Sequence, residues 1–370
     1  MLEREDFYPI LEQTLAQYKE KIGVADGEIK VRTVNNTDKL YVNVRLNAIL
    51  AKHPSKTVRD YLNTEYRVSG SLARRMMVKA YLWTSTHFVP TLAQKSIHIS
   101  FGEDTKISNI LIYPCNKKIR MFDFNKGVVY TMLKKGFPSL YIDRETSFRL
   151  TRKEPFVPRI EQYSNGFYSE RIIQGKPLAR LYDEDVVKEC KSKALQYVVS
   201  MTDEDDRISV SDYIKGVKAN CLEQLHRKQS FVDSDLVETI FDSLLNVDTT
   251  EEISLVMSHG DFQPGNIWIS EDEQIVIIDW ETVKKRSRYY DFVALYFDLR
   301  KKNSYQRVIE QIMSSNEIIG MDDTCSSKTI AKVVLAEELA YQTEELISFP
   351  DDIGVKEYLQ VLNEYKTIVL

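Results

Sequence analysis

The chain has 370 residues, of which 43% are hydrophobic and 11% aromatic, so it is long enough for two packed lobes and too apolar for a disordered protein. Its 50 basic and 55 acidic residues give a formal net charge of -5 with no long basic run, which argues against a nucleic-acid platform, and no apolar stretch has the length of a membrane span. No signal peptide is recognisable and the cysteines form no CxxC pair, so we expect a cytoplasmic protein without a zinc site or disulfides; the cysteines are Cys115, Cys190, Cys221 and Cys325.

The N-terminal region, residues 1–106, combines predicted helices with a predicted strand. Apolar residues recur at helical spacing over Asp6–Ile22 and Ser71–Trp83, and Tyr41–Leu46 alternates as a strand does. These patterns contain no recognisable motif. We therefore treat the region as an N-terminal extension of unclear fold and assign it no function.

Residues 107–175 are predicted to form a small antiparallel sheet with one inserted helix. Three strand-like runs follow one another across short polar turns, and a helical segment, Asp143–Lys153, separates them from two further runs. Lys117 and Lys118 lie in the first of these turns, where we expect them to be solvated. The predicted strands are Asn109–Tyr113, Ile119–Phe124, Val128–Leu133, Phe156–Gln162 and Phe167–Ile173.

Residues 176–370 are predicted to form a mainly helical lobe. Val186, Cys190, Ala194 and Val198 recur every four residues, which is typical of the buried stripe of a helix. One β-hairpin interrupts the helices. Its strands are Ile267–Ser270 and Ile275–Ile278, joined by the polar loop Glu271–Gln274.

The hairpin is predicted to bring three polar side chains together. If Ser270 opposes Ile275, Asn266 and Asp279 become cross-strand neighbours about 5 Å apart between their Cα atoms. Asp261 lies on the loop that leads into the hairpin. A carboxylate with an amide oxygen suits Mg²⁺, and a second carboxylate can take the proton of an attacking hydroxyl. The alternative is that these residues only cap turns and end a strand, but their joint spacing favours the site.

Two motifs in this segment resemble the catalytic region of a known enzyme family. His259-Gly260-Asp261 followed by Asn266 resembles the HGDxxxxN motif of aminoglycoside phosphotransferases and choline kinases. Ile278-Asp279-Trp280-Glu281 resembles the metal-binding segment of the same family, and Tyr290-Asp291-Phe292 resembles a segment further along its chain. The motifs stand in the family's order and at a similar separation, so together they are far more specific than any one alone.

The resemblance implies a role for each matching residue. Asp261 is expected to be the catalytic base, while Asn266 and Asp279 are expected to bind Mg²⁺. His259 is expected to brace the catalytic loop through hydrogen bonds, and a direct role for it as general base is the lesser alternative. Asp291 is expected to stabilise the same loop; capping a helix is compatible with that role.

The resemblance also implies a nucleotide-binding lysine in the N-lobe. A kinase-like N-lobe presents a lysine at the end of its third strand and a glutamate on the following helix. Lys134 and Glu145 occupy these places, so Lys134 is expected to hold the nucleotide phosphates and Glu145 to fix its side chain. Lys135 is the alternative lysine.

The segment Ser169–Gly175 resembles the hinge that grips the adenine edge in this family. The backbone groups expected to do so include those of Glu170 and Ile172, and Gly175 is expected to permit a chain reversal. The loop that would cover the phosphates, Pro114–Lys118, contains no glycine and so departs from the protein-kinase pattern. Contact of Lys117 and Lys118 with phosphate is the alternative to their solvation.

These observations together predict an α+β fold. The resemblance implies a bilobal, protein-kinase-like architecture with a small antiparallel-sheet N-lobe (107–175), a mainly helical C-lobe (176–370) and the additional N-terminal region (1–106). The implied activity is the Mg²⁺-dependent transfer of the γ-phosphate of ATP or GTP to a hydroxyl of a small molecule, such as a sugar, an amino sugar or a choline-like alcohol.

Two alternatives to a small-molecule kinase fit these residues less well. A nucleotide-binding pseudokinase or regulatory interaction protein has no chemical need for Asp261, Asn266 and Asp279 together. A protein kinase needs a longer activation segment, whereas Asp291 follows Asp279 within a dozen residues. The acceptor, the choice between ATP and GTP and the oligomeric state stay open at this point.

Overall fold

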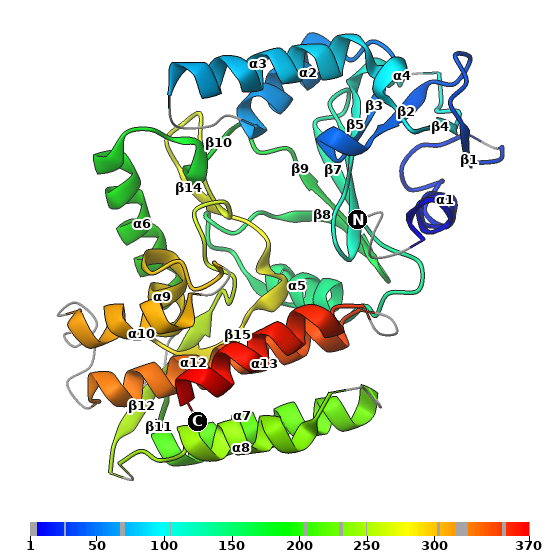
Figure 1. The fold of residues 1–370 in the computed structure, drawn as a ribbon. Coiled ribbons are helices and arrows are strands. Elements are labelled where there is room, and N and C mark those ends of the chain that lie inside the picture. The colour runs from blue at the N-terminus through cyan, green and yellow to red at the C-terminus, as the bar shows by residue number, and fades with distance from the viewer. Residues whose placement is uncertain are drawn as a thin grey trace. The chain divides into compact units, whose positions relative to one another are not determined.

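The computed structural model describes ten segments of the chain, which belong to two compact units (Figure 1). The first unit comprises Met1–Val187 and Trp268–Ile278, and the second comprises Lys188–Ile267 and Asp279–Leu370. The described residues are 6–25, 27–66, 71–103, 105–202, 206–228, 232–248, 250–301, 304–315, 325–349 and 353–369.

The first unit is built on an antiparallel sheet that has nine strands within the described residues, in the order β1-β4-β2-β3-β5-β6-β7-β9-β8. The predicted antiparallel sheet is therefore present, and β8 starts four residues later than expected. The first hundred residues contribute β1–β4, which continue the same sheet past β5. The bounds are β1 Lys30–Thr33, β2 Leu40–Asn43, β3 Ala48–Ala51, β4 Lys95–His98, β5 Ile110–Pro114, β6 Lys118–Asp123, β7 Val128–Leu133, β8 Ile160–Ser164 and β9 Phe167–Arg171.

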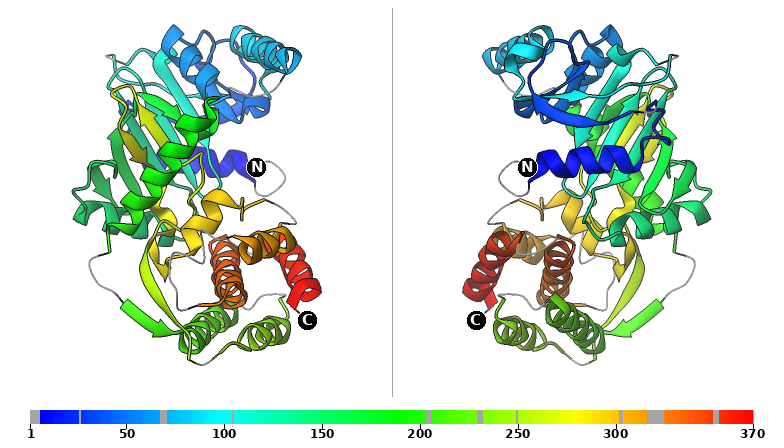
Figure 2. Two further views of the ribbon diagram at one scale, coloured as in Figure 1. Left: turned by 90° about the vertical axis from the view of Figure 1, so that its left-hand side faces the viewer. Right: turned by 90° about the vertical axis from the view of Figure 1, so that its right-hand side faces the viewer.

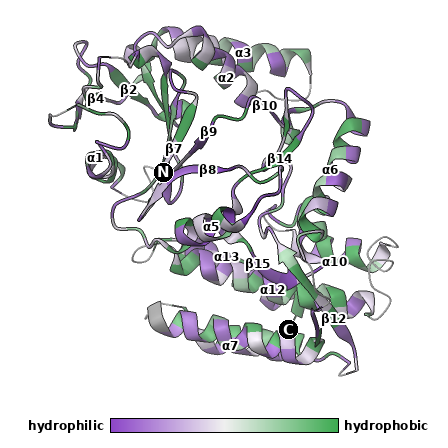
Figure 3. Ribbon diagram, turned by 180° about the vertical axis from the view of Figure 1, so that it is seen from behind, coloured by the Kyte–Doolittle hydropathy of each residue, from purple (hydrophilic) through white to green (hydrophobic). Residues whose placement is uncertain are grey.

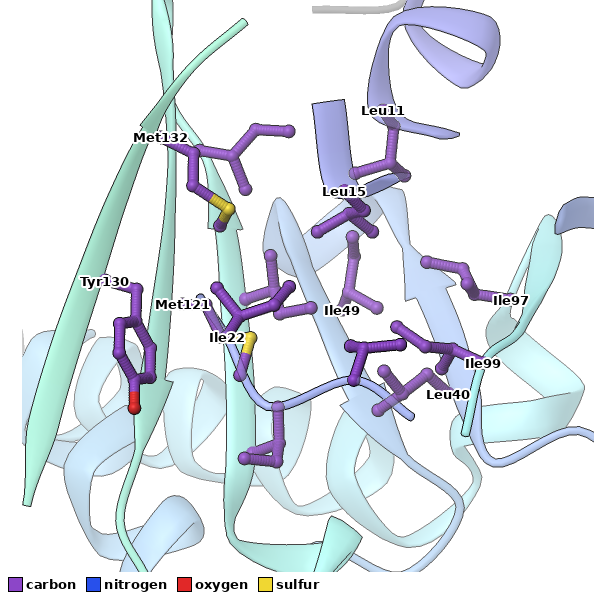
Figure 4. Close-up of a cluster of buried hydrophobic side chains, with 14 of the residues drawn as sticks. Leu11, Leu15, Ile22, Leu40, Ile49, Ile97, Ile99, Met121, Tyr130 and Met132 are labelled. Carbon is purple, nitrogen blue, oxygen red and sulfur yellow. The ribbon is translucent and has the colours of Figure 1, made fainter. Parts of the chain in front are cut away.

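A hydrophobic core lies on each face of this sheet. Successive side chains of each strand point to opposite faces, so one strand contributes to both cores. On β6, Met121 joins a core with Leu11 and Leu15 of α1 (Phe7–Gln17), as Figure 4 shows. Phe122 faces the other core, beneath the helices that precede β4. These helices are α2 (Lys56–Glu65), α3 (Leu72–His87) and α4 (Val89–Leu92), and the helix inserted between β7 and β8 is α5 (Leu140–Thr151).

The predicted hairpin forms part of a smaller sheet. It consists of β13 (Ile267–Ser270) and β14 (Ile275–Ile277), and the Ser270 N–H closes it by donating to the Gln274 carbonyl at 2.9 Å. Strand β10 (Gly175–Pro177) pairs with β13. A Cβ on Gly175 would lie 2.2 Å from the Ile269 carbonyl oxygen. Glycine is thus required there by the close approach of β13, which corrects the expected role in a chain reversal.

The second unit is mainly helical, as predicted, with a small antiparallel sheet in the order β11-β12-β15. Helix α12 contains thirteen buried residues and packs on α7, α8, α10 and α13 (Figure 2). Figure 3 shows apolar and polar residues interspersed along α7. The bounds are α6 Glu184–Val199, α7 Val210–Lys228, α8 Ser234–Leu244, α9 Tyr290–Tyr296, α10 Tyr305–Ser314, α12 Ser327–Ile347, α13 Val355–Val369, β11 Asp206–Ser209, β12 Glu252–Ser258 and β15 Lys284–Ser287.

The fold class predicted from the sequence, α+β with an antiparallel-sheet part and a mainly helical part, is confirmed. Within the described ranges, no helix combines the length and the apolar character needed to cross a membrane.

Helix α12 carries a buried carboxyl group, Glu337, in the middle of the second unit. Its oxygens accept hydrogen bonds from the Ser287 N–H at 2.6 Å, the Ser287 hydroxyl at 2.7 Å and the Tyr213 hydroxyl at 2.5 Å. Burial raises the pKa of Glu337 to about 7 in spite of these donors, because a charged carboxylate loses its water. The proton is therefore bound more tightly in the folded state than in the unfolded chain.

We expect Glu337→Gln to remove a pH dependence of stability. A raised folded pKa contributes stability that is fully present below the unfolded value of 4.5 and is lost as the pH rises through about 7. Between pH 5 and 8 the free energy of unfolding of the variant should therefore rise relative to wild type by roughly 2 kcal/mol. Urea unfolding at several pH values measures this, and Glu310→Gln, at an exposed position of α10, serves as the control. Parallel pH profiles for Glu337→Gln and wild type would contradict it.

Candidate active site

A buried carboxylate, Asp291, holds the loop that contains the first motif. Strand β12 ends at Ser258, and Asp291 lies in the first turn of α9. One carboxylate oxygen accepts the His259 N–H at 2.7 Å, and the other accepts the Gly260 N–H at 3.0 Å. Two backbone donors that cannot pair in a strand are satisfied in this way. The expected contact of Asp291 with the loop is therefore present.

Gly260 is the residue that lets the chain turn at this point. Its φ of +85° lies in the left-handed region, and a Cβ would lie 2.6 Å from the Thr282 carbonyl and 2.5 Å from Nη1 of Arg286. Arg286 is buried and donates from Nη1 to the Thr282 carbonyl at 3.0 Å. The glycine of the motif is thus required by both backbone conformation and space.

Two side chains of the same loop, Asn266 and Gln263, contact Asp261. The Asn266 amide donates to Oδ2 of Asp261 at 3.1 Å and to its carbonyl oxygen at 2.8 Å. Gln263 also donates to Oδ2, at 3.1 Å. Asp261 and Asn266 are therefore brought together as predicted. With both its N–H groups directed to Asp261, the amide of Asn266 offers its carbonyl oxygen as a ligand atom.

His259 is fully buried and contacts its own loop. Its Nδ1 accepts the backbone N–H of Asp261 at 3.3 Å, and its ring centroid lies 4.6 Å from that of Trp280. The Thr282 hydroxyl donates to the His259 carbonyl at 2.9 Å. These contacts favour the bracing role over that of a direct general base, and they dock the segment that follows Asp279 onto the loop.

Asp279 lies two residues after the end of β14 and adopts a left-handed backbone, with φ +67°. A carboxylate oxygen of Asp279 lies within 4.8 Å of one of Glu281. Two oxygens that share an octahedral Mg²⁺ at about 2.1 Å are no more than about 4.2 Å apart, so a small side-chain adjustment suffices. The donor set fits Mg²⁺. Glu281 was not predicted as a ligand, although its place two residues after Asp279 is visible in the sequence.

Arg300 is a site residue that no motif predicted. Its Nε lies 3.6 Å from Oδ1 of Asp261, Nη2 donates to the Gly260 carbonyl at 2.5 Å, and Nη1 lies 3.0 Å from the buried carboxylate of Glu338 on α12. Its guanidinium also lies 3.3 Å from the ring centroid of Tyr341. Burial alone would lower the pKa of Arg300, but Glu338 and its neighbours hold it well above the usual value. Arg300 thus stays charged and orients Asp261.

In the first unit, a chain of buried charges surrounds the predicted Glu145. Glu145 accepts from Nη1 of Arg149 at 2.9 Å and lies 3.6 Å from Nζ of Lys118. Arg149 also pairs with Glu170, which lies 3.0 Å from Nη2 of Arg120. Burial would raise the pKa of Glu170, but Arg149 and Arg120 lower it overall.

Two lysines of the β5–β6 turn are less exposed than expected. Lys117 and Lys118 are buried rather than solvated, since Lys117 lies over the Tyr141 ring at 3.4 Å and Lys118 reaches Glu145. Lys134, the predicted partner of Glu145, is also buried and donates from Nζ to the Asn116 carbonyl at 2.9 Å.

The predicted hinge residues are engaged in the sheet. Glu170 lies on β9 and pairs with Val129 of β7, and the Ile172 N–H donates to the Gly127 carbonyl at 2.9 Å. That N–H is therefore already used within the protein. Contact of this segment with adenine stays a prediction.

Comparisons with known proteins agree with the motifs. Residues 202–312 match the model of the Phosphotransferase enzyme family (APH), and this range includes all the site residues of the second unit except Glu338 and Tyr341. A search of curated proteins gave no match.

Solved structures were also compared. The streptomycin–ATP ternary complex of APH(2″)-IIa is 14% identical, with a TM-score of 0.45, covering 70% of this chain and 93% of that one. An ethanolamine kinase from Plasmodium vivax has 14% identity and a TM-score of 0.45, covering 88% and 99%. A choline kinase from Cryptosporidium parvum Iowa II has 13% identity and a TM-score of 0.41, covering 72% and 91%.

Residues 202–312 match the model of the Phosphotransferase enzyme family, in agreement with the resemblance inferred from the motifs.

We expect Arg300→Ala to destabilise the second unit by about 2–4 kcal/mol, because Glu338 stays buried without its cation. Tyr290, Tyr305 and Gln342 still donate to Glu338, which limits the loss. Adding Glu338→Gln to Arg300→Ala should recover part of the lost free energy of unfolding, because the buried side chain is then uncharged. Urea unfolding of the four proteins of this double-mutant cycle measures the coupling.

Lys301→Ala is the matched control, since Lys301 is the exposed neighbour of Arg300 and should change stability by less than about 0.5 kcal/mol. Equal effects of Arg300→Ala and Lys301→Ala, or additive effects in the cycle, would show that the ion pair does not link α12 to the loop.

Proposed function

We propose that the chain transfers the γ-phosphate of ATP or GTP to a hydroxyl of a small molecule, with Asp261 as the catalytic base. The observation that carries this proposal is the arrangement around one carboxylate: Asp261 accepts from Asn266 and Gln263 and faces Arg300, on a loop fixed by Asp291. The family match over the same residues supports it. We place the reaction in the cytoplasm, in keeping with the dispersed cysteines.

The carboxylate of Asp261 is held in a fixed orientation before any substrate arrives. Asn266 and Gln263 fix Oδ2, and Arg300 lies on the side of Oδ1. A carboxylate held in this way can orient an acceptor hydroxyl and accept its proton. The hydroxyl oxygen then forms a bond to the γ-phosphorus while the bond from that phosphorus to the β–γ bridging oxygen breaks. The nucleoside diphosphate leaves, and Asp261 later releases the proton to water.

Metal binding is assigned to the carboxylates that follow β14. Asp279 and Glu281 offer two oxygens within 4.8 Å of each other, and Asn266 offers an amide oxygen. Mg²⁺ held by these oxygens would supply the positive charge that the nucleotide phosphates require. The left-handed backbone of Asp279 and the buried Trp280 fix the direction of this segment.

For the nucleotide phosphates, the first unit offers two buried lysines. Lys118 is paired with Glu145, which is the arrangement that a phosphate-binding lysine has in kinases, and Lys134 is the lysine predicted from the motif order. A sugar, an amino sugar and a choline-like alcohol all present the hydroxyl that the proposed base needs.

Asp261→Asn should abolish acceptor-dependent transfer, with a loss of at least about 10²–10³-fold, because the amide cannot accept the proton. Nucleotide binding should persist. The assay is Mg²⁺-dependent nucleotide consumption across panels of sugars, amino sugars, choline-like alcohols and nucleosides. Asp272→Asn, in the exposed turn of the β13–β14 hairpin, is the charge-matched control.

If wild type and Asp261→Asn bind nucleotide equally and neither transfers phosphate to any acceptor, a nucleotide-binding regulatory protein should replace this proposal. Transfer by wild type that survives in Asp261→Asn would instead remove only the assignment of the base.

Glu281→Gln should raise the Mg²⁺ concentration needed for half-maximal nucleotide binding by about tenfold, since a neutral amide oxygen is a weaker ligand than a carboxylate. Asp279→Asn should have at least the same effect. Titration calorimetry with nucleotide at a series of Mg²⁺ concentrations measures both. An unchanged Mg²⁺ requirement in Glu281→Gln would assign that carboxylate a structural role only.

A further inference from the structure

A second candidate site lies wholly within the first unit. Helices α2 and α3, together with Tyr182, line a cavity of about 720 Å³. A volume of this size is typical of pockets that bind small molecules. None of the residues that line it belongs to the catalytic loop, and the proposed phosphotransfer assigns no task to it.

The charged groups of this cavity are mostly cationic. Arg59, Arg75 and Lys79 line it, against the single carboxylate of Asp60. Nη1 of Arg59 donates to the Pro54 carbonyl at 2.6 Å, which fixes its guanidinium at the wall. Helix α3 contains no acidic residue along its whole length. The cavity therefore favours an anion over a cation.

Helix α3 also contributes exposed apolar side chains to the lining of the cavity. Leu72 is 69% exposed, Met76 60% and Trp83 56%, and all three line the cavity. A cluster of large, exposed apolar side chains at a concave surface is typical of a binding site. The Trp83 ring stacks on His87 with centroids 4.7 Å apart and planes inclined by 24°, which gives one wall a flat face.

We propose that this cavity binds an amphipathic anion: a molecule with an aliphatic or aromatic body against Leu72, Met76 and Trp83, and a phosphate or carboxylate head at Arg75 and Lys79. Arg59 adds charge at the α2 wall. Both kinds of lining residue would contribute to binding. The apolar body of the ligand would be removed from water, and its anionic head would accept charge-assisted hydrogen bonds. The proposal does not depend on the phosphotransfer reaction and can fail or hold independently of it.

The probe is dodecyl phosphate below its critical micelle concentration. Of the three tryptophans, all in the described part of the chain, Trp83 is exposed whereas Trp268 and Trp280 are buried. Binding should therefore change the Trp83 emission, and calorimetry gives an independent affinity. Dodecyltrimethylammonium, with the same chain and the opposite charge, should bind at least tenfold more weakly.

The decisive variants lie on one helix. Arg75→Glu with Lys79→Glu should weaken binding of dodecyl phosphate at least tenfold and reduce the preference over dodecyltrimethylammonium. Arg74→Glu with Met77→Ala changes exposed neighbours on α3 that do not line the cavity, and should alter binding less than twofold. Unfolding midpoints in urea confirm that all variants are folded to the same extent.

Two results would overturn the proposal. Equal weakening by the lining and non-lining variants would show adsorption to the surface of α3 and not occupation of the cavity. Binding to phosphatidylglycerol vesicles with none to dissolved dodecyl phosphate would assign α3 to a membrane surface. Binding of dissolved dodecyl phosphate that depends on Arg75 and Lys79, with or without vesicle binding, supports the cavity.

Discussion

The site of the second unit depends on the contact between the Asp291 carboxylate and two consecutive backbone N–H groups, those of His259 and Gly260. The chain leaves β12 here and turns through the left-handed Gly260, so neither donor can find a partner in a strand. Hydrogen bonds to a buried carboxylate contribute roughly 1.5–3 kcal/mol each, and a buried donor without a partner would cost a similar amount. This contact therefore sets the direction from which Asp261 and Asn266 enter the site.

Ion pairs connect the buried helix α12 to the loop that carries Asp261. Arg300 touches Glu338 of the buried helix α12 on one side and Asp261 with the Gly260 carbonyl on the other. Buried ion pairs are expensive in desolvation and often contribute little net stability, so their presence here indicates a requirement for orientation. The alternating acids and bases of the first unit, Glu145, Arg149 and Glu170, follow the same pattern around α5 and β9.

Local patterns predicted most strands and the proximity of Asp261 to Asn266, whereas contacts between residues far apart in the sequence were not predicted. Strands β7 and β13 span the residues predicted for them, and β14 ends one residue earlier than predicted, because period and turn chemistry are local properties. Arg300 lies 39 residues beyond Asp261, and no spacing rule links the two. Lys118 was expected in solvent because its turn is polar, and only the fold reveals that α5 places Glu145 beside it. The pairing of β3 with β5, which joins the first hundred residues to the sheet, is likewise non-local.

The left-handed conformation of Asp279 shows why the second motif needs its residue types in this order. A non-glycine residue in this region is strained by about 1 kcal/mol, although aspartate tolerates it better than most, and such strain persists only where the surroundings fix it. Here the ring of Trp280 packs on His259, and the Thr282 hydroxyl is bonded to the His259 carbonyl. The chain is therefore bent out of β14 and held there, and the carboxylates of Asp279 and Glu281 converge. The two motifs are thus one structure: the loop positions the carboxylate pair, and the strained turn in return buries the histidine that braces the loop.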